Sequence, residues 1–388
     1  MSRFLIFIAI ILAIVVGIHY YLWVRLVRDS QLPPPWRAIA TFALVLMAAA
    51  MPLAMLLGRK LPSAGRVMAW PAFIWMGVMF LLLVAVVGAD IVRLVVWFTR
   101  RASGAPADPS RRLATARLAA TAALSLSGGL AAVALRAARG PVAVRRVEVA
   151  LARLPRVHDG LRIVQVSDIH VGSTIGGAFV ADVVRRANAL GPDLVAITGD
   201  VVDGTVAELA EAVAPLGELR ARHGVYFVTG NHEYFSGAEA WMTELGRLGI
   251  RVLRNERVSI GTGGVDGFDL AGVDDRSAER YGGLPHDEAL ARALGGRDPA
   301  REVVLLAHQP ASFAGAARHG VGLQLSGHTH GGQIWPFGFI VRLSQPFLAG
   351  LHRQGASQIY VSRGTGYWGP PMRLGAPAEI TELILRRA

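Results

Sequence analysis

Four long apolar runs occupy the first 140 residues, and they restrict the fold of this part of the chain more than any other feature. The first run, FLIFIAIILAIVVGIHYYLWV (residues 4–24), carries no charged residue and is long enough to cross the hydrocarbon core of a bilayer. It ends in Tyr20, Tyr21 and Trp23, aromatic residues of the kind that gather at the membrane–water interface. The other runs are residues 38–57, 68–98 and 113–135. Residues 1–140 are therefore predicted to form an all-α, multi-pass membrane region of about four transmembrane helices.

Charge is distributed as unevenly as hydrophobicity. Residues 1–140 contain 15 Lys and Arg against 3 Asp and Glu, whereas residues 141–388 contain 25 of each, so the net charge of +12 belongs entirely to the apolar part. Basic proteins often bind nucleic acid. Here the basic residues flank membrane-length runs and the rest of the chain is neutral, so no nucleic-acid partner is expected. Asp90 and Arg93, near the end of the third run, are expected to pair on one helix face at the membrane interface.

The positive-inside rule does not fix the orientation, because Arg and Lys residues fall on both sides of a four-span arrangement. Ser110-Arg111-Arg112, before the fourth run, contains a twin-arginine pair of the kind found in export signals. This pair favours an extracytoplasmic location for the part of the chain that follows. The chain has no cysteine, which excludes disulfides and thiolate metal sites.

From residue 141 onward, short β-branched runs alternate with helical stretches and Gly-rich turns, a pattern typical of an α/β fold. Strands are predicted at residues 144–150, 161–166, 194–198, 225–228, 268–273, 303–307, 322–325, 358–361 and 379–385. Helices are predicted at residues 179–190, 206–219, 238–248 and 287–294. Residues 141–388 are therefore expected to form a second domain.

Asp, Asn or His appears directly after five of these predicted strands. The residues are Asp168 and His170, Gly199 and Asp200, Gly230, Asn231 and His232, His308, and Gly327, His328 and His330. Ligands of α/β folds gather beyond the carboxyl ends of strands. Each short motif is weak by itself, but five in this order predict one site rich in oxygen and imidazole donors.

The same motifs resemble those of the calcineurin-like metallophosphoesterase superfamily. The series is Asp168-x-His170, Gly199-Asp200-x-x-Asp203, Gly230-Asn231-His232-Glu233, His308 and Gly327-His328-Thr329-His330. Further segments resemble the membrane-associated bacterial branch of that superfamily, namely Gly331-Gly332-Gln333, Tyr360-Val361-Ser362-Arg363-Gly364 and Pro377-x-Glu379-Ile380-Thr381. The resemblance runs from about Leu161 to the C-terminus and implies a two-sheet sandwich flanked by helices. It does not cover the membrane region.

The resemblance also implies a binuclear metal site, in which Asp200 and a hydroxide bridge two divalent ions. Asp168, His170 and His330 would complete the first metal site, and Asn231, His308 and His328 the second. Carboxylate, imidazole and amide ligands without thiolate suit Mn, Fe or Zn. The bridging hydroxide would attack the phosphorus atom directly.

Residues beside the ligands have further expected roles, several with an alternative. His232 is expected to stabilise the transition state and protonate the leaving oxygen. Asp203 is expected either to fix the tautomer of His232 or to cap the helix that begins at Val206. Arg363 either binds a substrate phosphate or forms a structural salt bridge. Glu233 receives no chemical role.

The sequence also suggests positions for one apolar segment and for the histidines outside the motifs. The apolar segment Ile334–Phe339 either packs as an ordinary loop or dips into the membrane interface. The histidines outside the motifs are expected at the surface or in turns; they are His158, His223, His286, His319 and His352.

These observations predict a membrane-tethered phosphoester hydrolase that cleaves a phosphodiester, a phosphomonoester or a pyrophosphate, with lipid-linked substrates in the preferred class. One alternative is a membrane protein whose metal domain is a sensing or assembly module with negligible turnover. Another is a transporter, which the sparse intramembrane charge disfavours. The oligomeric state is left open.

Overall fold

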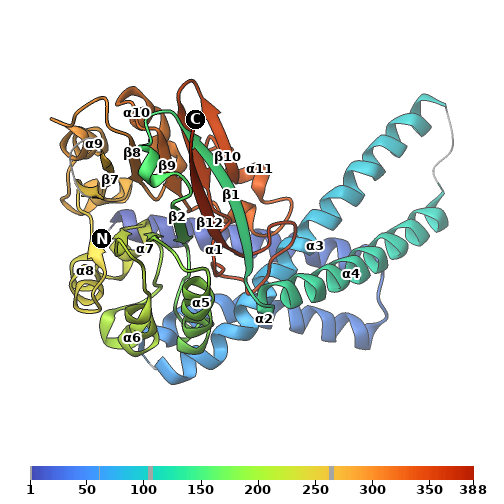
Figure 1. Ribbon diagram of the computed structural model, residues 1–388. Coiled ribbons are helices and arrows are strands. Elements are labelled where there is room, and N and C mark those ends of the chain that lie inside the picture. Colours follow the sequence, from blue (N-terminus) through green and yellow to red (C-terminus); the bar gives the residue numbers. More distant parts are fainter. Residues whose placement is uncertain (1, 61, 104–107, 262–265) are drawn as a thin grey trace. The chain divides into compact units, whose positions relative to one another are not determined.

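The computed structural model describes residues 2–60, 62–103, 108–261 and 266–388 (Figure 1). Contacts between residues divide the chain into two compact units. A helical unit comprises residues 1–136 with 369–372, and an α/β unit comprises residues 137–368 with 373–388.

The helical unit contains four long helices in its described part. They are α1 (Ser2–Trp23), which continues into one π-helical turn at Val24–Arg28, α2 (Pro34–Lys60), α3 (Pro62–Ala102) and α4 (Pro109–Arg139). Each has the length and apolar composition needed to cross a membrane. Three of them begin at a proline, whose fixed φ suits the first helical turn. The helices extend beyond the predicted runs because the flanking basic and small residues also favour helix.

Asp90 of α3 joins two helices as well as pairing with its neighbour. Its carboxylate lies 3.2 Å from Nη1 of Arg93, the expected partner on the same helix. It also accepts a hydrogen bond from the Tyr21 hydroxyl of α1, and Arg25 Nε lies 2.8 Å away. The sequence therefore predicted the Asp90–Arg93 pair but not the connection to α1, because that contact spans more than 60 residues.

Two six-stranded sheets form the centre of the α/β unit. The first has the order β1-β12-β2-β3-β4-β5 and the second β10-β11-β9-β8-β7-β6. The strands of the first sheet are β1 (Ala143–Leu151), β2 (Arg162–Val166), β3 (Leu194–Thr198), β4 (Val225–Val228), β5 (Arg251–Val252) and β12 (Glu379–Arg387). Those of the second are β6 (Glu256–Ile260), β7 (Phe268–Gly272), β8 (Val303–Leu306), β9 (Leu323–Ser326), β10 (Gly350–Gln354) and β11 (Ser357–Val361).

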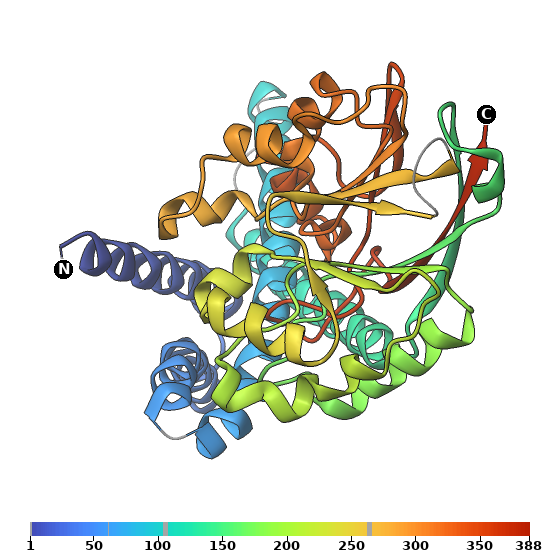
Figure 2. The same cartoon turned by 60° about the vertical axis from the view of Figure 1, so that its left-hand side comes forward.

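Seven helices accompany the sheets in the described part of this unit: α5 (Gly177–Ala189), α6 (Val206–Val213), α7 (Asn231–Ser236), α8 (Ala238–Arg247), α9 (His286–Leu294), α10 (Phe313–Arg318) and α11 (Gly338–Val341). Figures 1 and 2 show the green α5 and α6 on the side of the first sheet and the orange α9 and α10 on the side of the second. The predicted two-sheet sandwich flanked by helices is confirmed.

All nine predicted strands are present, and three further strands were missed. The missed strands lie at or next to sheet edges: β5 has two residues, and β6 and β10 are only partly buried. Helices α7, α10 and α11 were missed because four to six residues are too few for a helical period to show in the sequence.

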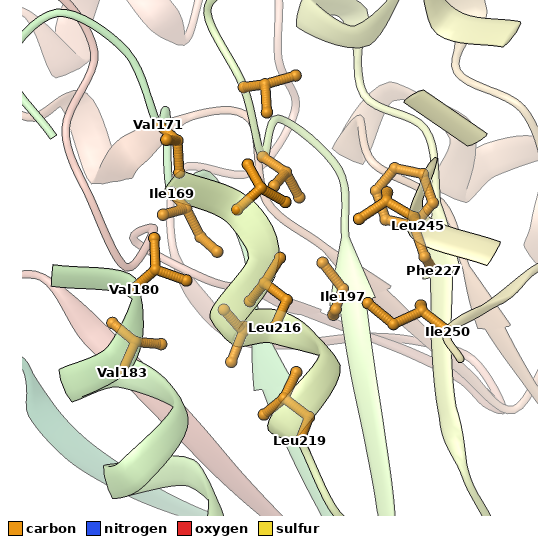
Figure 3. Packing of buried hydrophobic residues seen from close by; sticks show 14 of the residues in the cluster. Ile169, Val171, Val180, Val183, Ile197, Leu216, Leu219, Phe227, Leu245 and Ile250 are labelled. Carbon is orange, nitrogen blue, oxygen red and sulfur yellow. The ribbon is translucent and has the colours of Figure 1, made fainter. Parts of the chain in front are cut away.

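Alternating side chains of the strands build two separate cores. Ile163 of β2 packs between the sheets, together with Leu194, Leu270 and Leu325. Its neighbour Val164 faces the opposite way and joins the core under α5 and α8. Figure 3 shows this second core, where Val180 and Val183 of α5 point toward the strand residue Ile197. Both faces of the first sheet are buried, and the sequence of β3 is therefore an almost continuous run of apolar residues. This packing holds the strand ends that carry the polar motifs.

Candidate metal centre

The polar motifs lie where the sequence predicted, immediately beyond the carboxyl ends of five strands. Strands β2, β3 and β4 are parallel neighbours in the first sheet, and β8 and β9 are parallel neighbours in the second. The first sheet carries Asp168, His170, Asp200, Asn231 and His232, and the second carries His308, His328 and His330. The sandwich thus brings two sets of loops to one place.

Seven of these side chains form three overlapping groups, and in each group the ligand atoms lie within 4.8 Å of one another. The groups are Asp168, His170 and His330; His170, Asp200 and His232; and Asp200, His308 and His328. The first and third correspond to the two ligand sets that the resemblance implies. Asn231 has an oxygen atom that can add to the third set, although amide groups do not enter the grouping.

Five of the expected ligands have a backbone conformation that non-glycine residues rarely adopt. Their φ angles are positive: Asp168 53°, His170 56°, Asp200 53°, His328 72° and His330 51°. Such left-handed residues persist only where surrounding structure enforces them, and they cluster at functional sites. Two adjoining glycines are needed for close approach, because a Cβ at Gly230 would overlap the Asp200 carboxylate and one at Gly327 would overlap that of Asp168.

Three buried polar atoms of the site have no hydrogen-bond partner in the described part of the chain. They are Oδ2 of Asp168, Oδ1 of Asn231 and Nε2 of His308. Buried polar atoms are nearly always bonded, so each unbonded one requires an explanation. All three can donate an electron pair to a cation, and the set of carboxylate, amide and imidazole atoms suits a transition metal or zinc. The residues present therefore fit bound metal.

Strong electrostatic coupling links the carboxylates and imidazoles. Burial raises the pKa of Asp168. At His308, burial opposes the charged form, yet the Asp200 carboxylate, with Oδ2 3.1 Å from Nε2, raises the pKa well above its usual value. Burial, together with the charge of the neighbouring His308, lowers the pKa of His328 to about 3. Metal ligation requires neutral imidazoles and ionised carboxylates. His328 already meets this requirement, whereas Asp168 and His308 would release their protons when a cation binds.

Asp203 contacts two histidine rings through one oxygen atom. Its Oδ1 lies 3.1 Å from Nδ1 of His170 and 2.6 Å from Nδ1 of His232. A carboxylate accepts, so each Nδ1 donates to Asp203, which leaves Nε2 as the atom through which His170 can bind a cation. Helix α6 is capped instead by Thr205, which exchanges hydrogen bonds with Glu208. The alternative in which Asp203 caps this helix is wrong.

Arg363 forms the salt bridge that was one of its two expected roles. Its Nη1 lies 2.9 Å from Oε2 of Glu379, and its backbone N–H donates to the same carboxylate. The side chain follows β11 and is mostly buried. Binding of a substrate phosphate by Arg363 stays a prediction.

Two buried ions that the sequence analysis did not use hold the loops of the site. Glu233 accepts from the backbone N–H groups of Asp200 (2.9 Å), Val201 (2.7 Å) and Gly230 (2.6 Å). Burial raises the pKa of this carboxyl to about 7. Its position three residues after Gly230 is the spacing of a helix-capping residue, a local signal that could have identified it.

The second buried ion is Arg373, whose side chain is fully buried. It donates to the backbone carbonyls of His330 (3.0 Å), Arg363 (2.7 Å) and Gly366 (3.0 Å), and its Nη2 lies 3.2 Å from Nδ1 of His330. No local pattern in the sequence marks Arg373, because its partners include His330, 43 residues away in the sequence.

Two histidines outside the site contradict the expectation of surface positions. His158 and His286 are buried, with 7% and 8% of their surface exposed. Neither ring nitrogen of His286 has a hydrogen-bond partner among the described residues. His158 ends a short helical segment, and its ring lies 5.2 Å from that of Phe268. His286 begins α9.

Comparison with known proteins gives the same family as the sequence motifs. Residues 161–332 match the family model for calcineurin-like phosphoesterase. A Bos taurus "Transmembrane protein with metallophosphoesterase domain" is 44% identical over 305 residues, which cover 76% of this chain and 68% of that protein. A Danio rerio protein of the same name is 40% identical over 274 residues (69% and 62%). An "Uncharacterized metallophosphoesterase" of Helicobacter pylori is 40% identical over 234 residues (60% and 61%).

The chain thus spans about two thirds of the length of these relatives. Two of them are named as transmembrane proteins, in agreement with the four apolar helices found here. The chain therefore belongs to the calcineurin-like metallophosphoesterases, a family of metal-dependent phosphoester hydrolases.

Proposed function

We propose that this chain is a membrane-tethered phosphoester hydrolase with two divalent cations bound side by side and Asp200 shared between them. The first cation is held by Asp168, His170 and His330, and the second by Asn231, His308 and His328. The observation that carries the proposal is the set of buried, unbonded ligand atoms on Asp168, Asn231 and His308. The two groups of ligands that meet at Asp200 support it further.

When bound, two such cations supply hydroxide near neutral pH and neutralise the phosphoryl oxygens during in-line attack. The remaining steps fall to side chains. His232 is partly exposed, with 17% of its side chain accessible, and Asp203 holds its Nδ1–H. We assign His232 to stabilising the transition state and protonating the leaving oxygen. Asp203 positions this ring, and Arg363 is assigned to the substrate phosphate through guanidinium donors that Glu379 does not occupy.

The proposed metals are Mn, Fe or Zn, all of which accept mixed carboxylate and imidazole ligands. The proposed substrate is a phosphodiester, a phosphomonoester or a pyrophosphate, with a lipid-linked substrate preferred. The surroundings of His232 support this preference, because its ring lies 5.3 Å from that of Phe235 and 6.2 Å from that of Trp368. Both aromatic side chains are largely exposed and could contact an apolar part of the substrate. We place the multi-pass chain in the cell membrane with the α/β unit on the extracytoplasmic side, as Arg111-Arg112 favours.

The test is a metal-reconstitution assay on the full chain in detergent, stripped of metal and reloaded with Mn, Zn, Fe or Mg. Hydrolysis of bis-p-nitrophenyl phosphate is compared with that of p-nitrophenyl phosphate, and Asp200→Asn is the matched variant. We expect metal-dependent turnover that this variant abolishes, with a lower metal content and an intact fold by circular dichroism. The amide cannot replace a shared, charged carboxylate.

Two results would contradict the proposal. Full activity of Asp200→Asn would remove the shared-carboxylate assignment. About two ions bound per chain, with no turnover of any soluble or lipid-embedded ester, would instead favour a sensing or assembly module.

A further inference from the structure

An exposed apolar surface lies directly after the second-sheet loop of the metal centre. It consists of Trp335, Phe339, Ile340 and Leu343, and we name it the α11 surface. The exposed fractions of these side chains are 61%, 68%, 54% and 87%. Single exposed apolar residues are ordinary, but four within nine residues, including two aromatic rings, mark an interaction site.

The fold holds this surface in a fixed helical shape. The backbone N–H of Phe339 donates to Pro336, that of Ile340 to Phe337 and that of Leu343 to Ile340, so helical turns run through and beyond α11. Phe339 and Leu343 are spaced four residues apart and therefore share one face of the helical turns, while Trp335 lies in the turn that precedes α11.

The inner side of the same segment is anchored to the metal-centre loop. Ile334 is buried. Gly332 (φ 81°) packs so closely on Gly338 that a Cβ would collide with that backbone. The Thr329 hydroxyl, between His328 and His330, donates to the carbonyl of Leu348 at 2.6 Å. The α11 surface is therefore rigidly connected to two of the expected metal ligands.

The sequence keeps the α/β unit close to a membrane. Helix α4 has the properties of a membrane span and ends at Arg139, and strand β1 begins at Ala143, so three residues connect them. Three residues bridge about 14 Å at most when fully extended. Tryptophan and phenylalanine are the side chains that anchor proteins at the membrane–water interface, and the exposed Arg342 in the same turn suits anionic headgroups.

We propose that the α11 surface docks into the interfacial layer of a lipid bilayer, the one that the chain's own helices cross. The surface has the chemistry of an interfacial anchor, and the short connection keeps a bilayer within reach of its unit. This explains why the segment following the metal centre exposes large apolar side chains, while comparable side chains of the strands are buried.

The docked surface also gives the metal centre access to substrates in the membrane, a consequence that rests on the proposed function. The Gln333 side chain exchanges two hydrogen bonds with the backbone of Trp368, at 2.8 and 2.9 Å. Trp368 in turn flanks His232. Trp368 thus links the segment that carries Trp335 with the proposed proton donor.

The test uses the absence of cysteine, because one introduced thiol can then be labelled alone. Phe339→Cys carries a fluorescent probe on the α11 surface. Val157→Cys is the matched control, since Val157 is also 68% exposed and lies elsewhere on the α/β unit. The full chain is placed in nanodiscs of phosphatidylcholine and phosphatidylglycerol and exposed to acyl-chain nitroxide or aqueous iodide. We expect the nitroxide to quench the probe at 339 at least about threefold more than the probe at 157, with the opposite order for iodide.

Equal access of iodide to both probes would overturn the proposal. Protection of the probe at 339 from both quenchers would overturn it as well, because a protein surface and not lipid would then cover α11. Neither readout requires turnover, so the result stands even if the chain proves inactive.

A second measurement uses charged variants of the full chain. Phe339→Asp and Leu343→Asp should lower kcat/KM by about tenfold for a phosphoester embedded in vesicles, because an interfacial side chain is lost. Hydrolysis of bis-p-nitrophenyl phosphate should be unchanged. An equal loss on both substrates would mean that the substitutions disturb the metal centre, which would contradict a docking role. Unchanged hydrolysis of both would remove the role in substrate access.

Discussion

The two sheets of the α/β unit contribute unlike halves to the same centre. The first sheet supplies all of the expected oxygen ligands, Asp168, Asp200 and Asn231, whereas the second supplies imidazoles alone. The loops are also held by opposite charges. Glu233 collects backbone N–H groups on the first sheet, and Arg373 collects backbone carbonyls after the second.

This difference shows how the site depends on assembly of the sandwich. The first half has only one of the four expected imidazole ligands, His170, and the second half has no expected carboxylate ligand, so neither alone holds a complete ligand set for the proposed metals. Each half needs its own buried ion because its loops turn back at the strand ends with unpaired backbone groups. The metal centre should therefore form only when the two sheets are packed together.

The largest expected effect is on kcat and metal content, and it should differ between a histidine of the first sheet and one of the second. His232→Ala should retain metal and lower kcat by about 10²–10⁴-fold, because a proton donor is lost while the ligands stay. His328→Ala, the matched variant on the second sheet, should lose metal. Metal content by mass spectrometry and steady-state kinetics check both. If His232→Ala also loses metal, His232 is a ligand, and the division between the two halves has to be redrawn.

A smaller effect is expected from the buried carboxylate of the first half. Glu233→Gln replaces one accepting oxygen by an amide NH₂ group, which then faces a backbone N–H that Glu233 had bonded. Misplacement of the Asp200 and Asn231 loops should weaken metal affinity by about 10–100-fold. A competition titration with a chelator measures this change.

The matched control for Glu233 is Glu208→Gln. Glu208 also accepts a backbone N–H, that of Thr205, but it lies exposed at the start of α6. This variant should leave metal affinity unchanged. Equal losses in the two variants would show that the change acts on general stability and not on the site.

The two halves of the metal centre also show which parts of the site could be predicted from the sequence. Each expected ligand follows a strand whose β-branched pattern is local, so Asp200 or His308 could be placed at the sheet edge by counting along the chain. Parallel pairing brings three of the loops together in the first sheet and two in the second, and packing of the two sheets joins them, as the motif resemblance implied. The positive φ angles at Asp168 and His328 were out of reach, because no local pattern distinguishes a strained residue from an ordinary turn.

Long-range contacts set the limit of the sequence analysis. Arg373 binds carbonyls on loops that only the folded chain brings near it. Asp203 was left with two roles because both depend on local geometry, and only the folded structure shows that Thr205 takes the capping role. His286 was expected at the surface or in a turn because it lies outside the motifs, whereas the folded chain buries it at the start of α9.

The smallest expected effect concerns His286, a histidine that belongs to neither half of the metal centre. Burial and the nearby charge of Arg276 lower its pKa to about 4, although Asp287 opposes the shift. The unfolded chain binds a proton at this residue near pH 6.5, whereas the folded chain does so only near pH 4. Stability from His286 is therefore complete above about pH 6.5 and is lost as the pH falls toward 4, by about 1–2 kcal/mol between pH 7 and pH 5.

His286→Gln should remove this contribution, and the fall in Tm of the α/β unit between pH 7 and pH 5 should shrink by about 2–4 °C per kcal/mol. The difference between variant and wild type isolates His286 because the metal ligands titrate in both. His319→Gln, an exposed position at the end of the neighbouring α10, should leave the pH dependence unchanged. Identical curves for His286→Gln and wild type would show that the His286 ring is solvated in solution. The acid sensitivity of the unit would then arise in the metal centre, where carboxylates and imidazoles of the two sheets are coupled.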